Sequence, residues 1–123
     1  MVSIVLSLYN PNLKYLQLQL QSIDAQDYGC MEIVLWDDYP QSTLTESDIA
    51  QMITRVPFRY IRCDKNLGYV KAFEKLTTLA RGKYIAYCDQ DDIWHPNKIS
   101  TCVRIMQKEH ALLVTSDRRE IDQ

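Results

Sequence analysis

The sequence predicts an α/β domain in which a mostly parallel sheet is covered by helices on both faces. Along the whole chain, short apolar runs alternate with segments whose apolar residues recur at helical spacing. The apolar runs are continuous, as in residues 2–8 and 84–88, which is typical of strands buried on both faces. The chain has 123 residues, of which 46% are hydrophobic and 24% charged, so we expect one folded domain with a single core.

The first half of the chain contains two predicted strands, residues 2–8 and 32–36. The Asn10-Pro11-Asn12 turn after the first strand leads into a helix, and Gly29 is available to end the segment that follows this helix. The helix is predicted from apolar residues at helical spacing: Leu13, Leu16, Leu20 and Ile23.

The second half continues the alternation. Residues 45–56 are predicted to be a helix, capped by Thr45 or Ser47, and the loop at 64–68 has turn chemistry. The remaining expected elements are a strand at 58–63, a helix at 69–80 ended by Gly82, a strand at 84–88, a helix at 96–109 with Pro96 in its first turn, and a last strand at 112–115.

Asp89, Asp91 and Asp92 crowd directly after the strand at 84–88. Carboxylates this close repel one another unless a cation or several hydrogen-bond donors offset the repulsion. The Asp89-x-Asp91 spacing suits one divalent cation, and hard oxygen ligands favour magnesium or manganese over zinc. The alternative is that Asp91 or Asp92 caps the helix that follows, although three acids exceed what capping requires.

Two further groups of polar residues are expected at the same edge of the sheet, where open α/β sheets bind their ligands. Asp37 and Asp38 follow a buried strand, and one of them is suited to accept a hydrogen bond from a ligand N–H, although Asp is also a common turn residue. Ser7 and Tyr9 end the first strand, where the tyrosine ring is able to pack on a flat base while Ser7 hydrogen-bonds it. A plain strand end that runs into a turn explains them equally well.

Composition and motifs exclude several classes of function. The formal charge of −2 gives no general attraction to nucleic acid, and neither a dinucleotide fingerprint nor a P-loop is present. The four cysteines form no CxxC pair, which argues against a disulfide framework or a zinc site and favours a reduced, cytoplasmic setting. No apolar run approaches the roughly 20 residues of a membrane span, and the N-terminus reads as a strand rather than a signal peptide.

Four segments follow one another over nearly the whole chain: VSIVLSLYN at 2–10, EIVLWDD at 32–38, NLG at 66–68 and GKYIAYCDQDDIWHPNKI at 82–99. In this order they resemble the N-terminal, nucleotide-binding half of a family 2 glycosyltransferase with the GT-A fold, a three-layer Rossmann-like arrangement. The DQDDIW form of the acidic segment is especially similar to bacterial rhamnosyltransferase-like members that build surface polysaccharides.

The resemblance implies a set of site residues. Asp38 would accept from the ring N–H of the nucleobase, Asp89 would contact the ribose or the outer shell of the metal, and Asp91 would be the direct metal ligand. The nucleotide-binding residues that it implies are Ser7, Tyr9, Asp38, Lys71 and Asp89, and the metal residues are Asp91 and Asp89. Lys71 falls near the position of a basic residue by the diphosphate, but as a single residue it is equally a solvated helix position.

The implied reaction is transfer of a glycosyl group, with inversion, from a UDP-, dTDP- or GDP-linked sugar to a saccharide or lipid-linked acceptor, with Mn²⁺ or Mg²⁺ as cofactor. The general base of the family lies in a downstream acceptor-binding half. We therefore expect residues 1–123 to be the donor-binding part, truncated before that half, which binds the donor and transfers poorly or not at all. The expected setting is the cytoplasm, including the inner face of the membrane. An uncovered apolar sheet edge or face would promote homo-oligomers.

Tyr39-Pro40 departs from the family pattern, which usually has Gly-Ser after the acidic pair. A receiver-type signalling domain is an alternative, because it has a similar length and clustered aspartates at one sheet edge. Receivers place their acidic pair after the first strand, where this chain has Ser7 to Asn10. A non-catalytic nucleotide-binding module is the other alternative, since a fold by itself does not decide function.

Overall fold

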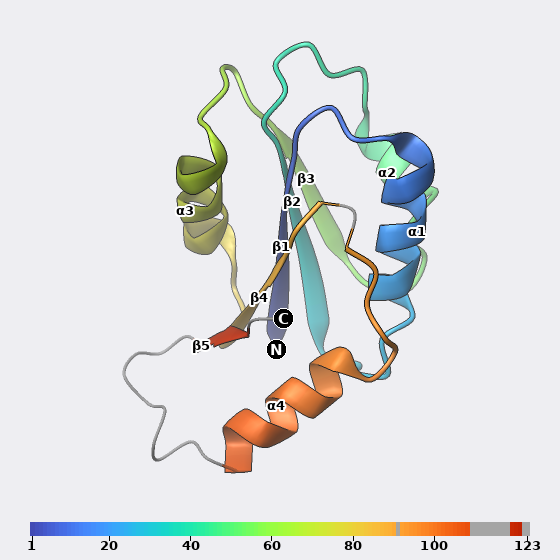
Figure 1. Cartoon of the computed structure of the whole chain (residues 1–123), viewed down its shortest axis with the longest axis vertical. Helices are drawn as coiled ribbons and strands as arrows, with labels where there is room; N and C mark the ends of the chain where they lie inside the picture. Colours follow the sequence, from blue (N-terminus) through green and yellow to red (C-terminus); the bar gives the residue numbers. More distant parts are fainter. Residues whose placement is uncertain (91, 109–118, 122–123) are drawn as a thin grey trace.

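The computed structural model describes residues 1–90, 92–108 and 119–121, and Figure 1 shows strands and helices alternating along the chain. The elements are β1 (Val2–Leu8), α1 (Leu13–Asp24), β2 (Met31–Asp37), α2 (Glu46–Ala50), β3 (Phe58–Arg62), α3 (Tyr69–Leu79), β4 (Tyr84–Cys88), α4 (Lys98–Lys108) and β5 (Arg119–Ile121).

In the described part of the chain, the sheet has five strands in the order β3-β2-β1-β4-β5, and every neighbouring pair is parallel. The central strand, β1, pairs with β2 on one side and with β4 on the other, so that Leu8 lies opposite Asp37 and Leu6 opposite Cys88. Because the strands are parallel, the segments that follow β1, β2 and β4 leave from the same edge of the sheet.

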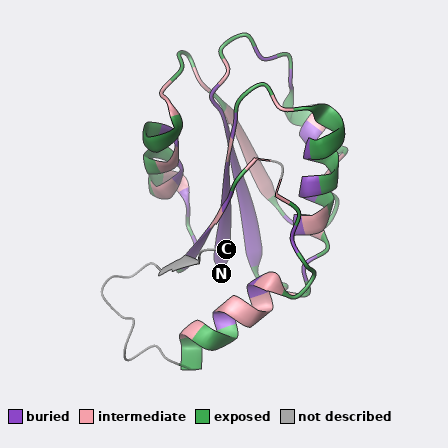
Figure 2. Ribbon diagram, viewed as in Figure 1, coloured by how far each residue is buried: buried purple, intermediate pink, exposed green. Residues whose placement is uncertain are grey.

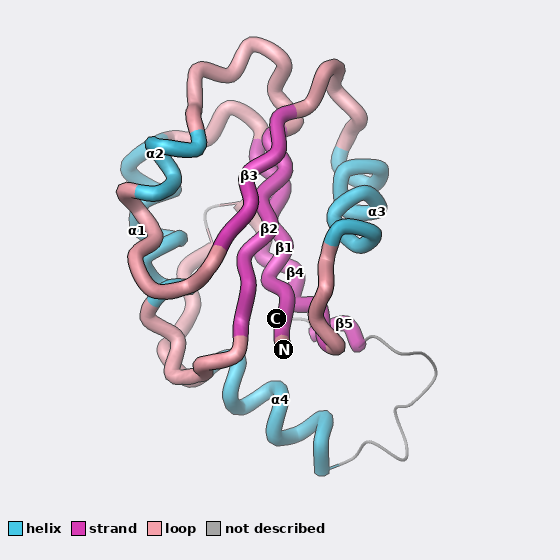
Figure 3. Tube along the Cα trace, turned by 180° about the vertical axis from the view of Figure 1, so that it is seen from behind, coloured by secondary structure: helices cyan, strands magenta, loops and turns pink. Residues whose placement is uncertain are grey.

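Helices cover both faces of the sheet, as the views in Figures 1 and 3 agree. The larger core cluster lies between the sheet and α1 and α2, and α4 adds Ile99 and Val103 to it. The smaller cluster lies under α3, which contributes Ala72 and Leu76. Figure 2 shows that β1 and β2 are buried over nearly their whole length, while the outer faces of the helices are exposed. The α/β fold with a parallel sheet and three layers is therefore confirmed.

The predicted helix at 45–56 is too long, because α2 ends at Ala50. Pro57 disfavours a helical conformation in the residue before it. The segment before this proline is held instead by the Asp24 carboxylate, which accepts hydrogen bonds from the backbone N–H groups of Thr54, Arg55 and Val56 at 2.9–3.1 Å. The capping box at Thr45 and Asp48 confirms Thr45, rather than Ser47, as the start.

Gly82 does not have the role expected of it. The residue after α3, Ala80, is extended, so α3 does not end in a left-handed glycine. A Cβ on Gly82 would lie 2.7 Å from the backbone oxygen of Met1 and 2.7 Å from Ser3 Oγ, so the glycine is required by close approach of two chain segments.

At the end of the chain, α4 begins at Lys98 rather than at Pro96. In its first turn the backbone N–H of Thr101 donates to the backbone oxygen of Asn97. The strand expected at 112–115 lies outside the described residues. Residues 119–121, which the sequence leaves in the tail, form β5 beside β4.

Candidate functional site

A cavity of about 460 Å³ lies at the edge of the sheet where the strands end. Each of the first four strands contributes residues to it through the segment at its carboxyl end. The lining comprises Ser7 and Tyr9 near the end of β1, Asp38 after β2, Asn66, Gly68, Tyr69 and Phe73 after β3, and Asp89 and Gln90 after β4. The structure thus brings together four of the predicted site residues, Ser7, Tyr9, Asp38 and Asp89.

The two acidic residues at the end of β2, Asp37 and Asp38, bond to different parts of the chain. Asp37 is fully buried and accepts hydrogen bonds from the Tyr60 hydroxyl and the Tyr39 backbone N–H. Burial, together with this bond to the Asp37 carboxylate, raises the pKa of Tyr60 above its usual range. The Asp37 side chain is therefore bonded to the neighbouring strand β3, through Tyr60, and Asp38 is the member of the pair that lines the cavity.

Asp38 is only 3% exposed, and its carboxylate accepts three hydrogen bonds from the chain itself. The donors are the indole N–H of Trp36 at 3.0 Å and the backbone N–H groups of Leu67 and Gly68 at 2.9 and 3.0 Å. A carboxylate offers about four lone-pair positions, so Asp38 retains little capacity for a ligand donor. Its first effect is to fix the loop that precedes α3.

That loop needs its glycine. Gly68 has φ of +86°, in the left-handed region that residues with a side chain rarely adopt, and it is the N-cap of α3. Its conformation turns the chain so that the backbone N–H groups of Leu67 and Gly68 both point at Asp38. The Asn66-Leu67-Gly68 turn seen in the sequence is thus a wall of the cavity.

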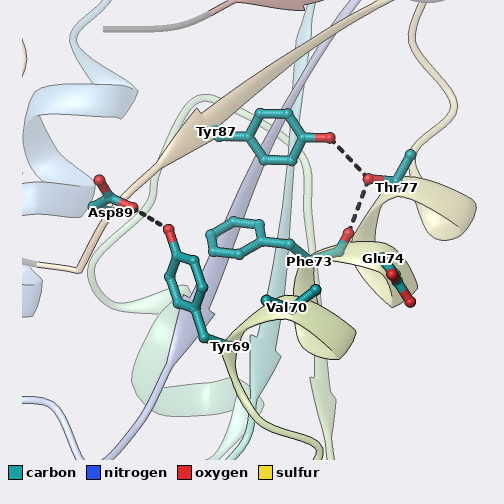
Figure 4. A pocket seen from close by; sticks show the side chains of 7 residues that line it. All are labelled: Tyr69, Val70, Phe73, Glu74, Thr77, Tyr87 and Asp89. Atoms are coloured by element: carbon teal, nitrogen blue, oxygen red, sulfur yellow. Dashed lines mark hydrogen bonds between the residues drawn. The ribbon is translucent and has the colours of Figure 1, made fainter.

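Asp89 is held by a tyrosine that sequence reasoning did not single out. The hydroxyl of Tyr69, in the first turn of α3, donates to Asp89 Oδ1 at 3.0 Å (Figure 4). The Tyr69 ring packs edge-on against Phe73, with 4.8 Å between ring centroids, and Phe73 packs in the same way against Tyr87 at 5.3 Å. The only signal in the sequence was the position of Tyr69 directly after the Asn66–Gly68 turn.

A second cavity, of about 370 Å³, lies between α3 and β4 and shares Tyr69, Phe73 and Asp89 with the first. Figure 4 shows its aromatic side chains in a row. The Tyr87 hydroxyl is hydrogen-bonded to Thr77 Oγ1 at 3.0 Å. The contact between Tyr69 and Asp89 therefore stands at the boundary of the two cavities.

The end of β1 is tied to the acidic segment. The backbone N–H of Tyr9 donates to the side-chain oxygen of Gln90 at 2.8 Å. The Tyr9 ring is 54% exposed and packs edge-on against Tyr39, with 5.1 Å between ring centroids. Tyr39 stands where the resembled family usually has glycine, so the departure from the pattern supplies an aromatic neighbour for Tyr9.

One predicted residue, Lys71, is not brought into this arrangement. Lys71 is exposed on α3 and is absent from the described lining of either cavity. Asp91 lies outside the described residues, whereas its neighbours Gln90 and Asp92 are described. Among the described residues, no three His, Cys, Asp or Glu side chains are gathered as a metal site. Within that same part of the chain, none of the helices has the length and apolarity to cross a membrane.

The comparisons with known sequences give a consistent result. Residues 3–123 match the family described as Glycosyl transferase family 2. The uncharacterized glycosyltransferase MJ1057 of Methanocaldococcus jannaschii is 33% identical over 110 residues, which cover 87% of this chain and 37% of that protein. The UDP-Glc:alpha-D-GlcNAc-diphosphoundecaprenol beta-1,3-glucosyltransferase WfaP of Escherichia coli is 32% identical over 112 residues, which cover 89% of this chain and 42% of that protein. The chain thus spans about two fifths of the length of these relatives.

Solved structures share the fold. TarS 1–349 of S. aureus, in complex with UDP-GlcNAc, matches with a TM-score of 0.76 at 22% identity, over 89% of this chain and 32% of that one. The mannosyltransferase PcManGT of Pyrobaculum calidifontis, in complex with GDP-Man and Mn²⁺, matches with a TM-score of 0.75 at 19% identity, over 85% and 32%. The sheet, the loops at its carboxyl edge and the family match agree, and they decide against a receiver domain: the chain belongs to glycosyltransferase family 2 and has the GT-A fold.

Proposed function

We propose that this chain is the donor-binding part of a glycosyltransferase and that the cavity at the strand ends holds a nucleotide diphosphate sugar. The observation that carries the proposal is the convergence of oxygen-bearing side chains from separate strand ends, among them Ser7, Asp38 and Asp89, on one cavity. The proposal is supported by the structural neighbours, which were solved with UDP-GlcNAc and with GDP-Man.

In this proposal the nucleobase lies against Tyr9 and is hydrogen-bonded by Ser7, while the lone-pair capacity that remains on Asp38 accepts from the ring N–H. The exposed Tyr9 ring offers an apolar face for a flat base. The ribose lies near Asp89, the next acidic group around the same cavity. Lys71 approaches the diphosphate only if its long side chain extends from the exposed face of α3.

A divalent metal, Mn²⁺ or Mg²⁺, fits the residues at this edge. Asp89 offers a carboxylate in the cavity. Asp92, three residues further on, lines a separate cavity beside Trp94, and its Oδ2 is buried with no hydrogen-bond partner among the described residues. An uncompensated buried carboxylate oxygen is costly, and hard oxygen ligands are those that Mg²⁺ and Mn²⁺ prefer. Asp91 and Asp89 would hold the ion. When bound, it would stabilise the negative charge that develops on the leaving diphosphate.

We further propose that the acceptor is a saccharide or a lipid-linked saccharide in polysaccharide biosynthesis, and that transfer inverts the anomeric carbon. The acceptor hydroxyl needs a general base. Residues 1–123 would be the nucleotide-binding part, with the base on a segment outside them, because the chain spans only about two fifths of its relatives. The setting would be the cytoplasm or the inner face of the membrane.

Titration calorimetry with UDP, dTDP and GDP, each with and without MnCl₂, tests the proposal. We expect one nucleoside diphosphate to bind more tightly with Mn²⁺ than without it, and Asp91→Ala to remove the difference. The proposal fails if none of the three binds, or if Asp91→Ala leaves the metal dependence unchanged. Binding without any transfer by the complete protein would instead support the non-catalytic nucleotide-binding module.

A further inference from the structure

The inner side of α1 carries polar side chains where a helix that covers a sheet normally has apolar ones. Gln19 and Ser22 are three positions apart, so they lie on one side of the helix, and Gln26 follows just after its end. Gln19 is fully buried and Gln26 is 3% exposed. A buried amide is costly unless it is hydrogen-bonded. The partners of these side chains should therefore explain why the positions are polar.

All three side chains attach to the segment between β4 and α4, residues 89–97, which we call the acidic loop, and two of them also bond Cys88 or Ile99 close to its ends. The Gln19 side-chain N–H₂ donates to the backbone oxygen of Asp89 at 2.5 Å and to Cys88 Sγ at 3.1 Å. Ser22 Oγ accepts from the backbone N–H of Trp94 at 3.2 Å.

Gln26 completes the attachment at the far end of the acidic loop. Its side-chain N–H₂ donates to the backbone oxygen of His95 at 2.7 Å, and its side-chain oxygen accepts from the backbone N–H of Ile99 at 3.0 Å. A backbone bond from Asp27 N to Pro96 O at 2.8 Å lies beside it. The acidic loop is therefore attached at Asp89, before residues 90–93, and at residues 94–96, after them. The attachments come from α1 and from the two residues that follow its C-cap, Gln26 and Asp27.

We propose that Gln19 is a positioning residue for donor and metal binding, and that it acts by setting the backbone of the acidic loop at Asp89. This inference rests on the proposed function of the cavity. Gln19 is the attachment nearest to the candidate ligands, because it bonds the peptide of Asp89 itself. The Asp89 side chain is held from the other face of the sheet by the Tyr69 hydroxyl. Backbone and carboxylate of one residue are thus fixed by two different helices.

The core by itself does not require glutamine at this position. The neighbouring buried positions of α1 are all apolar: Leu16, Leu20 and Ile23. Methionine has a similar shape and would fill the same space, but it has no donor for the oxygen of Asp89. Partners that orient metal-binding groups typically contribute 10- to 100-fold to metal affinity. A substitution of Gln19 should therefore lower the nucleotide affinity more when the metal is present than when it is absent.

The experiment compares Gln19→Met with Gln21→Met, which makes the same change at an exposed position of the same helix. The affinity for UDP is measured by calorimetry with and without MnCl₂, and amide hydrogen exchange is measured over residues 88–99. We expect Gln19→Met to lose about tenfold or more of the UDP affinity measured with Mn²⁺ and clearly less without it. Exchange in the acidic loop should become faster, and Gln21→Met should match the unaltered chain.

Equal losses of UDP affinity with and without Mn²⁺, or unchanged exchange in the acidic loop, would overturn the role of Gln19. If circular dichroism shows that Gln19→Met does not fold, Gln19→Leu, which matches the neighbouring buried residues of α1 and has no donor, is measured in its place, and the same results are expected of it. If the unaltered chain binds none of UDP, dTDP or GDP, the proposed function fails. The exchange measurement still decides whether Gln19 holds the acidic loop.

Discussion

At the scale of single residues, buried charge is tolerated where the chain supplies donors. Glu32, at the amino end of β2, is 7% exposed and accepts hydrogen bonds from Ser3 Oγ at 2.5 Å, from the backbone N–H of Arg81 at 2.7 Å and from Arg59 at 3.2 Å. Burial alone would raise the pKa of Glu32, but these hydrogen bonds and the Arg59 charge together hold it below its usual value. The carboxylate is therefore stabilised in its ionised form.

Glu32→Gln should lower the free energy of unfolding at pH 7 by about 1–3 kcal/mol, because the amide is a poorer acceptor and leaves Arg59 without its carboxylate. The pKa is lower in the folded chain than in the unfolded one. The stabilisation by Glu32 is therefore fully present above about pH 5 and is lost as the pH falls through the folded pKa. Urea unfolding between pH 3 and pH 7 should show a steeper decline below about pH 5 for the unaltered chain than for Glu32→Gln. Parallel curves would contradict this account.

At the scale of elements, one carboxylate holds a segment that was expected to be the last turns of a helix, residues 51–56. The Asp24 side chain, at the end of α1, accepts from the backbone N–H groups of Thr54, Arg55 and Val56 and from the Thr54 hydroxyl. Burial raises the pKa of Asp24, but the hydrogen bonds outweigh this effect and the net shift is downward. The segment between α2 and β3 is consequently fixed by tertiary contacts with α1 instead of by a helix of its own.

Asp24→Ala should destabilise the chain by about 1–3 kcal/mol, because it removes a charged acceptor from three backbone N–H groups, of which that of Val56 belongs to a buried residue. Asp27→Ala is the matched control, since Asp27 is an exposed aspartate only three residues away. Surface changes of this kind usually stay within about 0.5 kcal/mol. Chemical denaturation measures the free energy of unfolding of both variants. Equal values for the two would show that the Asp24 hydrogen bonds do not contribute to stability.

At the scale of the whole molecule, the two ends of the sheet differ: the amino end is closed by tight packing, and the carboxyl end carries a cavity. The amino end is closed by the Glu32 network and by the tight approach of Gly82 to Met1 and Ser3. The carboxyl end carries the cavity and the acidic loop. The structure also leaves large apolar side chains exposed on its helices, among them Leu13, Tyr15 and Leu18 on α1 and Tyr69 and Val70 on α3. Such groups favour association when they are contiguous.

We expect the 123-residue chain to self-associate as its concentration rises, because exposed apolar groups of α1 and α3 are removed from water in the associated state. Light scattering over a concentration series measures this directly. Leu18→Glu should shift the series toward the monomer, whereas Gln17→Glu, an exposed neighbour on the same helix, changes the charge alone. A monomer at every concentration would be inconsistent with the expectation.

The sequence by itself determined the alternation of strands and helices, the parallel sheet and the residues that gather at its carboxyl edge. Continuous apolar runs and helical spacing are local signals, and the edge follows from the parallel sheet, which is why Ser7, Tyr9, Asp89 and the pair Asp37 and Asp38 were expected there; the choice of Asp38 came from the family resemblance. The assignment of Asp91 to a metal stays a prediction, since that residue lies outside the described part of the chain.

Only the tertiary structure decided which partner each polar group has. Asp37 and Asp38 are adjacent in sequence, yet one bonds Tyr60 and the other bonds the loop before α3. The sequence gives Gln19 no special role until the acidic loop is placed beside it, and the segment after α2 is held by Asp24, which lies 30 residues before Thr54. The physical reason is that hydrogen bonds between distant segments leave no periodic trace in the sequence, whereas burial of apolar faces does.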